Sequence, residues 1–193
     1  MIIGITGGTG SGKTTLLKLM EKCGVLVLDC DAIYHELLST DPSLPAAIER
    51  RFPGTVECGQ LQRKKLGEIV FSDENALLDL NKITHHAIRD EVLRRLKIAP
   101  AHAAIDAVAL FKSGMDDLCD ITVAVTAPPE VRLQRLMARD GISAAYAQKR
   151  IDAQPTDAWF RSKCDYVLEN QGTQAEFQSK CLAFLQELGI MDA

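Results

Sequence analysis

Short apolar runs alternate with longer amphipathic stretches along most of this chain. The runs are rich in Val and Ile, which suits strands that are buried on both faces of a parallel sheet. Strands of this kind that alternate with helices favour an α/β fold in which helices cover the sheet. The predicted strands are Ile2–Ile5, Val25–Leu28, Ala103–Val108, Ile121–Val125 and Tyr166–Leu168.

The pattern changes between residues 41 and 97. Proline and glycine interrupt the first part of this segment, at Pro42, Pro45, Pro53 and Gly54. The rest is typical of helices, including a long, leucine-rich amphipathic stretch over 75–98. We therefore expect a helical insertion in the α/β core and not a separate domain.

The first predicted strand leads into the sequence GGTGSGKT, residues 7–14. It matches the phosphate-binding P-loop, G-x-x-x-x-G-K-[ST], and stands between a strand and a helix expected over 14–21. Glycine lets the loop turn its N–H groups inward around a polyphosphate. Lys13 adds positive charge for the β- and γ-phosphates, and the Thr14 hydroxyl suits Mg²⁺. The predicted nucleotide contacts are Gly8, Gly10, Ser11, Gly12, Lys13, Thr14 and Thr15.

Composition narrows the function further. With 193 residues, 47% of them hydrophobic and 25% charged, the chain suits one large globular domain or one core with an insertion. A net charge of −4 argues against a nucleic-acid partner, which needs a basic surface. No apolar run approaches the ~20 residues that span a bilayer, and the chain opens on a core strand rather than a signal peptide. The six cysteines form no C-x-x-C. We expect reduced thiols and a cytoplasmic protein without a membrane partner.

Aspartates stand at the ends of two predicted strands. Asp29 and Asp31 follow the second strand, where a carboxylate would accept the proton of an attacking hydroxyl. The alternative is that either residue caps a helix that begins near Ala32. Asp106 follows the apolar run 103–105, as in a Walker B strand whose carboxylate helps to hold Mg²⁺.

Basic residues cluster between residues 128 and 163. Arg132, Arg135 and Arg139 are spaced i, i+3 and i+7, which places them on one helical face. This face is either solvated or part of a lid that closes arginines over the phosphates. Arg139 is the first candidate for such a role, and Gly141 marks a hinge between two helices.

A P-loop alone does not separate GTPases, ATPases and small-molecule kinases, but an insertion and a late arginine-rich segment suit a nucleoside-kinase-like architecture. Within this class the chain resembles the dephospho-coenzyme A kinase family from end to end. The resemblance lies in the order and spacing of several motifs. They are Ile5–Thr14, the D-x-D of 29–31, Leu61-Gln62-Arg63 with Val70-Phe71, Leu80 to Ile88 with His85, the lid helix 132–140, Arg150-Ile151 with Gln154, and 165–172.

The chain departs from this family at a few positions. The family usually carries P-L-L-F-E after the third strand, whereas this chain has Val108 and Lys112 in place of the Pro and the Glu. His86 replaces the Pro that follows His85. A lysine at position 112 would repel Mg²⁺, so reduced or altered activity stays open.

The resemblance implies a three-layer P-loop NTPase fold with a five-stranded parallel sheet. The core would comprise 1–40, 98–127 and 164–193, with a helical acceptor-binding insertion at 41–97 and a lid at 128–163. The protein, a monomer or weak homo-oligomer, would use ATP and Mg²⁺ to phosphorylate the ribose 3′-hydroxyl of dephospho-coenzyme A.

The resemblance also implies roles for individual residues. Asp31 would be the general base, supported by Asp29, while Lys13 and Arg139 stabilise the transferred phosphoryl. Arg63 and His85 would help to bind the acceptor, together with Asp29, Asp31 and Asp106, and Thr14 and Asp106 would hold the metal. Two alternatives remain: a kinase for another small acceptor, and a nucleotide-binding homologue with impaired catalysis.

Overall fold

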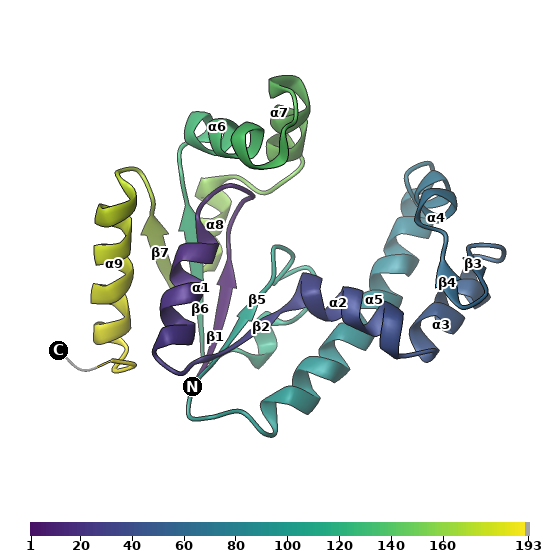
Figure 1. Cartoon of the computed structure of the whole chain (residues 1–193), viewed down its shortest axis with the longest axis horizontal. Coiled ribbons are helices and arrows are strands. Elements are labelled where there is room, and N and C mark those ends of the chain that lie inside the picture. The colour runs from purple at the N-terminus through teal and green to yellow at the C-terminus, as the bar shows by residue number, and fades with distance from the viewer. Residues whose placement is uncertain (192–193) are drawn as a thin grey trace. The chain divides into compact units, whose positions relative to one another are not determined.

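The computed structural model describes residues 1–191, which fall into two compact units. The first unit comprises residues 1–27 and the chain from residue 99 onward, and the second comprises 28–98. The first unit carries the large sheet, and the second is mainly helical (Figure 1). Strand β2 (Leu26–Asp29) begins in the first unit, where the Leu26 N–H donates to the His102 carbonyl. It then leads the chain into the second unit.

The sheet has five strands in the order β2-β5-β1-β6-β7. Strand β1 (Ile2–Thr6) pairs in parallel with β5 (Ala103–Asp106) and β6 (Ile121–Thr126), and β6 pairs in parallel with β7 (Tyr166–Glu169). The predicted five-stranded parallel sheet is confirmed. Strand β5 ends two residues earlier than predicted, because the chain turns away from β1 over residues 108–114.

Helices cover the sheet on both faces, as expected for a three-layer fold. Helices α1 (Lys13–Lys22) and α9 (Gln174–Glu187) lie side by side on one face (Figure 1). On the other face α8 (Asp157–Lys163) packs on β6 and β7. Apolar side chains fill the space between the sheet and the α1–α9 pair, among them Ile3, Ile5, Leu16, Met20, Val123, Val125, Phe177 and Phe184.

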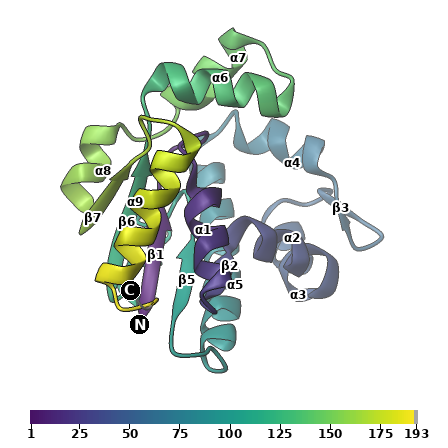
Figure 2. The same ribbon diagram turned by 60° about the vertical axis from the view of Figure 1, so that its left-hand side comes forward.

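Helices α6 (Pro129–Asp140) and α7 (Ala144–Asp152) pack on each other (Figure 2). Leu136, Ala147 and Ile151 form the buried cluster between them. Gly141 separates the two helices with a φ of 64°, a left-handed conformation that glycine adopts without steric cost. The structure therefore places a helix break at the predicted hinge residue.

The second unit is built around one long helix, α5 (Glu74–Leu96). It contacts α2 (Cys30–Thr40), α3 (Ser43–Arg51) and α4 (Arg63–Val70). Apolar side chains from these four helices are buried, including Ile33, Leu37, Leu44, Ile48, Leu66, Val70, Ile88 and Val92.

This unit also contains a hairpin that the sequence did not predict. Strands β3 (Val56–Glu57) and β4 (Gln60–Leu61) pair in antiparallel fashion. Cys58 and Gly59 join them with φ values of 50° and 77°, as a two-residue hairpin turn requires. The prediction of helices alone was wrong here, because two-residue strands are too short to produce an alternating pattern.

None of the helices in residues 1–191 has both the length and the apolar character needed to cross a membrane. All six cysteines are free. Burial raises the pKa of Cys119 to about 12 and that of Cys181 to about 11, so these thiols stay protonated and unreactive at neutral pH.

Candidate active site

The loop between β1 and α1 requires glycine at two close approaches. Gly7 has a φ of 135°, and a Cβ there would lie 2.1 Å from the Val125 carbonyl oxygen. Gly12 has a φ of 105°, and its Cβ would lie 2.3 Å from Asn170 Nδ2. The loop backbone therefore packs directly against the ends of β6 and β7, where a side chain would not fit.

The N-terminus of α1 suits an anion. Gly12 provides no side-chain cap, and the first turn contains no acidic residue but begins with Lys13. The unsatisfied N–H groups and the helix dipole therefore present a positive potential. Lys13 Nζ lies 3.1 Å from the Gly7 carbonyl oxygen, so it is folded back across the loop. Ser11 Oγ is buried and has no hydrogen-bond partner in residues 1–191. These donors fit a polyphosphate, which offers only acceptors.

Arg132 of α6 holds the tip of this loop. Its guanidinium donates from Nε to the Thr9 carbonyl oxygen at 2.9 Å and from Nη2 to Gln154 Oε1 at 2.8 Å. Gln154 Oε1 also accepts from the Thr9 N–H at 2.8 Å. Arg132 is only 3% exposed, and this burial lowers its pKa. The Asp157 carboxylate lies 4.0 Å from Arg132 Nη1.

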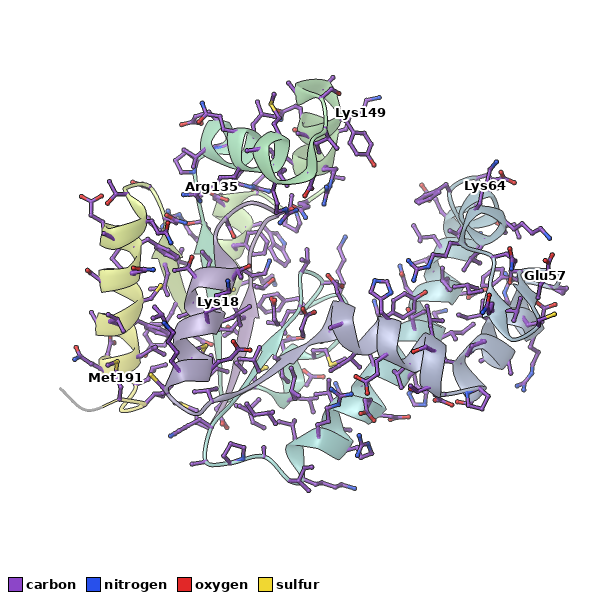
Figure 3. The ribbon with its side chains drawn as sticks, viewed as in Figure 1. Lys18, Glu57, Lys64, Arg135, Lys149 and Met191 are labelled. Carbon is purple, nitrogen blue, oxygen red and sulfur yellow. The ribbon has the colours of Figure 1, made fainter. Side chains whose placement is uncertain are left out.

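Arg135 holds the second half of the loop. It donates from Nη1 to the carbonyls of Gly10 and Ser11, at 3.2 and 3.3 Å, and from Nη2 to Asn170 Oδ1 at 3.2 Å. Asn170 Nδ2 donates to the Ser11 carbonyl at 2.8 Å, and Figure 3 shows Arg135 below α6 beside the loop. The P-loop is thus held from behind by side chains that come from residues more than 100 positions later in the chain.

Sequence reasoning missed these four residues as partners of the P-loop. The sequence places Arg132 and Arg135 on a face that is either solvated or part of a lid, and Gln154 in a family motif. It places Asn170 at the carboxyl end of the last strand, where a ligand crevice is expected, but not against the P-loop. The same signal was available for Arg132, which follows the carboxyl end of β6 by a few residues.

Arg139 does not contact the P-loop in this structure. Its Nε and Nη2 donate to the carboxylate of Asp140 at 2.6 and 3.0 Å, and Arg150 Nη1 reaches the same carboxylate at 2.7 Å. These hydrogen bonds, chiefly those from Arg139, lower the pKa of Asp140 to about 2. The Arg139 side chain is 59% exposed. The two arginines therefore share one carboxylate at the break between α6 and α7.

Asp106 lies beside the P-loop strand, at the end of β5. The register pairs it with Ile5, one residue before β1 ends at Thr6. This is the position of a Walker B carboxylate on the neighbouring strand. No group of three or more His, Cys, Asp or Glu side chains arranged for a metal occurs in residues 1–191. Mg²⁺ in kinases needs only one or two carboxylates, since phosphates and water complete its shell.

In the second unit Asp29 is the N-cap of α2. Its Oδ1 accepts from the N–H groups of Asp31 and Ala32, at 2.9 and 3.0 Å. The capping alternative is therefore what the structure shows for Asp29. The Asp31 carboxylate lies exposed in the first helical turn and makes no hydrogen bond or ion pair with the residues described. The cap leaves Asp31 as the available proton acceptor of the D-x-D.

The two residues expected to bind the acceptor lie in the same unit. Arg63 Nη2 is 3.1 Å from His35 Nδ1, which accepts this hydrogen bond when it is unprotonated. Tyr34 lies beside His35, with ring centroids 5.5 Å apart. His85, on α5, is half-buried, and this burial lowers its pKa. A neutral imidazole at His85 would donate or accept a hydrogen bond without carrying charge.

Comparison with known proteins agrees with this architecture. A family model described as Dephospho-CoA kinase matches residues 1–176. The Dephospho-CoA kinase of Latilactobacillus sakei subsp. sakei (strain 23K) is 35% identical over 176 residues, or 89% of this chain and 87% of the relative. The crystal structure of TT1252 from Thermus thermophilus superposes with a TM-score of 0.82 at 34% identity, covering 97% of each chain.

A second solved structure, a Dephospho-CoA kinase from Campylobacter jejuni, superposes with a TM-score of 0.69 at 27% identity and covers 98% of each chain. The family match covers the P-loop, the helical unit and the α6–α7 segment in their order along the chain. This chain belongs to the dephospho-CoA kinase family.

Proposed function

We propose that this protein transfers the γ-phosphoryl group of ATP to the ribose 3′-hydroxyl of dephospho-coenzyme A, giving coenzyme A and ADP. The observation that carries the proposal is a P-loop held in shape by four side chains, in a chain that matches this family over residues 1–176. The 3′-oxygen attacks the γ-phosphorus, the bond to the β,γ-bridging oxygen breaks, and the hydroxyl proton passes to the base.

The P-loop would bind the triphosphate through its backbone N–H groups and Lys13. The residues assigned to this role are Gly8, Gly10, Ser11, Gly12, Lys13, Thr14 and Thr15. Mg²⁺, when bound, would neutralise charge on the β- and γ-phosphate oxygens, and Thr14 and Asp106 are the residues proposed to hold it. Lys13 must leave the Gly7 carbonyl to reach a phosphate, which a flexible lysine chain permits.

We assign the general base to Asp31. The cap of α2 occupies Asp29 Oδ1, so Asp29 supports the backbone of Asp31 and does not compete for the proton. General-base catalysis typically contributes about 10²–10⁴-fold in rate. Positioning and charge stabilisation by the P-loop contribute the larger share in phosphoryl transfer.

The remaining parts have proposed roles as well. Residues 41–97, with Arg63 and His85, would bind the acceptor, and the core would comprise 1–40, 98–127 and 164–193. Residues 128–163 would act as the lid that brings Arg139 to the transferred phosphoryl and excludes water. Arg139 would then exchange Asp140 for phosphate, while Arg132 and Arg135 stay bonded to the loop.

The test is ADP release from Mg-ATP with and without dephospho-coenzyme A, with coenzyme A detected as a product. Asp31→Asn is expected to lower turnover by about 10²–10⁴-fold and to leave ATP affinity nearly unchanged. Asp73→Asn is the matched control, because Asp73 is the N-cap of α5 in the same unit, asparagine is an equally good N-cap, and no role in transfer is assigned to it. Lys13→Ala is expected to abolish transfer.

Wild-type turnover in Asp31→Asn would overturn the assignment of the base. ATP binding without acceptor-dependent ADP release would overturn the function itself and favour a nucleotide-binding homologue with impaired catalysis. Lys112 and Val108 motivate this alternative, since they replace an acidic residue and a proline of the family. Turnover with a different small acceptor would instead show that the protein is a kinase for that acceptor.

A further inference from the structure

The tip of the P-loop is fixed at a single residue, Thr9. Its backbone N–H donates to Gln154 Oε1 at 2.8 Å, and its carbonyl accepts from Arg132 Nε at 2.9 Å. Arg132 Nη2 closes the ring by donating to the same Gln154 oxygen at 2.8 Å. Both backbone polar groups of Thr9 are therefore satisfied by side chains, and its N–H is not available to a phosphate.

Arg132 also shapes the loop on either side of Thr9. A Cβ at Gly8 would lie 2.2 Å from Arg132 Nη2, and one at Gly10 would lie 3.0 Å from the Arg132 carbonyl oxygen. The loop thus packs directly against Arg132, with glycine at both contacts. Rotation of the backbone at Thr9 would break two hydrogen bonds and leave Nε of a buried guanidinium unsatisfied, which is costly.

We propose that Arg132 and Gln154 are positioning residues that hold the P-loop in its phosphate-binding shape before ATP arrives. This inference rests on the proposed function only in that the P-loop binds ATP. Preorganisation lowers the cost of binding, because the loop does not have to be ordered by the ligand. Neither side chain needs to contact the nucleotide for this effect.

The position of the two residues extends the proposal to the lid. Arg132 lies near the start of α6, and Gln154 lies two residues after α7, which ends at Asp152. The two ends of the α6–α7 segment therefore meet at Thr9. Loosening the pair would release the loop and the base of the lid together, whereas Arg139, between them, bonds to Asp140.

Two substitutions at Gln154 separate positioning from charge. Gln154→Leu removes the acceptor and keeps the cation of Arg132. Gln154→Glu keeps an oxygen that accepts both hydrogen bonds and adds a negative charge beside the guanidinium. Gln154 is only half-buried, so both variants are compatible with folding. Arg161→Met, which removes a surface arginine paired with Glu169, is the matched control for loss of a polar contact in the same unit.

The measurement is the Kd for Mg-ATP by calorimetry without acceptor, alongside KM for each substrate and the thermal midpoint. We expect Gln154→Leu to weaken ATP binding by about 10-fold and to raise KM for ATP, not for the acceptor. Gln154→Glu should lose less affinity than Gln154→Leu, because it keeps both hydrogen bonds although its charge opposes the phosphates, and Arg132→Lys should lie between wild type and Gln154→Leu.

An unchanged ATP affinity in Gln154→Leu would overturn the proposal, even if the thermal midpoint fell, since the pair would then be merely structural. A larger loss in Gln154→Glu than in Gln154→Leu would also overturn it, because the charge of Arg132 would then matter more than the bonds. Since ATP binding is measured without an acceptor, this result is independent of whether dephospho-coenzyme A is the substrate.

Discussion

The P-loop edge of the sheet and the helical unit 28–98 use arginine in opposite ways. At the P-loop, Arg132 and Arg135 are directed at backbone carbonyls and side-chain amides, and the Asp157 carboxylate lies 4.0 Å from Arg132. In the helical unit, arginines pair with carboxylates near the surface. Arg51 bonds to Asp79, and Arg94 and Arg95 bond to Glu91.

This difference follows from what each region must do. A polyphosphate brings several negative charges, so a carboxylate beside the loop would oppose its binding. Buried arginines that are satisfied by neutral acceptors keep the loop in shape and keep its surroundings positive. No polyphosphate site is assigned to the helical unit, so carboxylates can pair with arginines there. These ion pairs join neighbouring helical turns or neighbouring helices. Surface pairs of this kind contribute little to stability.

The largest expected effect lies in the loop backbone. Gly7→Ala places a Cβ 2.1 Å from the Val125 carbonyl oxygen, at a φ of 135°. The loop or β6 must shift, so we expect a loss of about 3 kcal/mol or more in the free energy of unfolding and loss of ATP binding. Urea denaturation and calorimetry with Mg-ATP measure the two effects.

Gly54→Ala in the helical unit is the matched control for this substitution. Gly54 has a φ of 82°, but a Cβ there would meet nothing within 4 Å. The variant therefore incurs only the left-handed backbone cost of about 1–2 kcal/mol and should retain ATP affinity. Equal losses at the two glycines would show that backbone conformation, and not the close approach to β6, makes the P-loop sensitive.

Regular elements could be predicted from the sequence because their signals are local. The run Ile2–Ile5 became β1, and the stretch predicted over 75–98 became α5 (Glu74–Leu96). The hairpin at Val56–Leu61 was missed because its short strands have no period and its turn depends on a cysteine at positive φ. The same limit applies to the site.

The P-loop and the D-x-D are contiguous motifs, so the sequence identified them, although their catalytic roles stay predictions. The partners of the P-loop are a different matter. Arg132 contacts a residue 123 positions away, and Asn170 one that is 159 positions away. The spacing of Arg132 and Arg135 marks a common helical face but not its burial. Only the packing of α6 against the loop determines that this face is not solvated.

In the helical unit, Glu91 is the ion-pair partner whose substitution should lower the free energy of unfolding most. Its side chain is 12% exposed, and hydrogen bonds first from Arg94 and then from Arg95 lower its pKa to about 2. The unfolded value is near 4.3, so the folded state binds its proton less tightly. This stabilisation is fully present above about pH 4.3 and is lost as the pH falls towards 2.

We expect Glu91→Gln to lower the free energy of unfolding by about 1 kcal/mol at pH 7, discounted for the exposed Arg94. The difference from wild type should shrink between about pH 4.3 and pH 2, which urea denaturation at a series of pH values would measure. A difference that stays constant over this range would mean that packing, and not the carboxylate charge, stabilises the contact of α5 with its arginines.

The smallest effect is expected at the exposed pair of Arg51 and Asp79, which joins α3 to α5. The Nε–Oδ2 distance is 2.8 Å, but the two side chains are 45% and 37% exposed. Asp79→Asn keeps the shape of the side chain and removes its charge. Because water and salt screen such a pair, the urea midpoint of the variant should not differ measurably from that of wild type. This should hold both at low salt and at about 0.5 M salt, where the Debye length is below about 10 Å. A loss as large as that of Gly54→Ala, abolished by salt, would show that ion pairs do hold the helical unit together. The arginines of the helical unit and those behind the P-loop would then differ only in their partners, and not in how much they stabilise the structure.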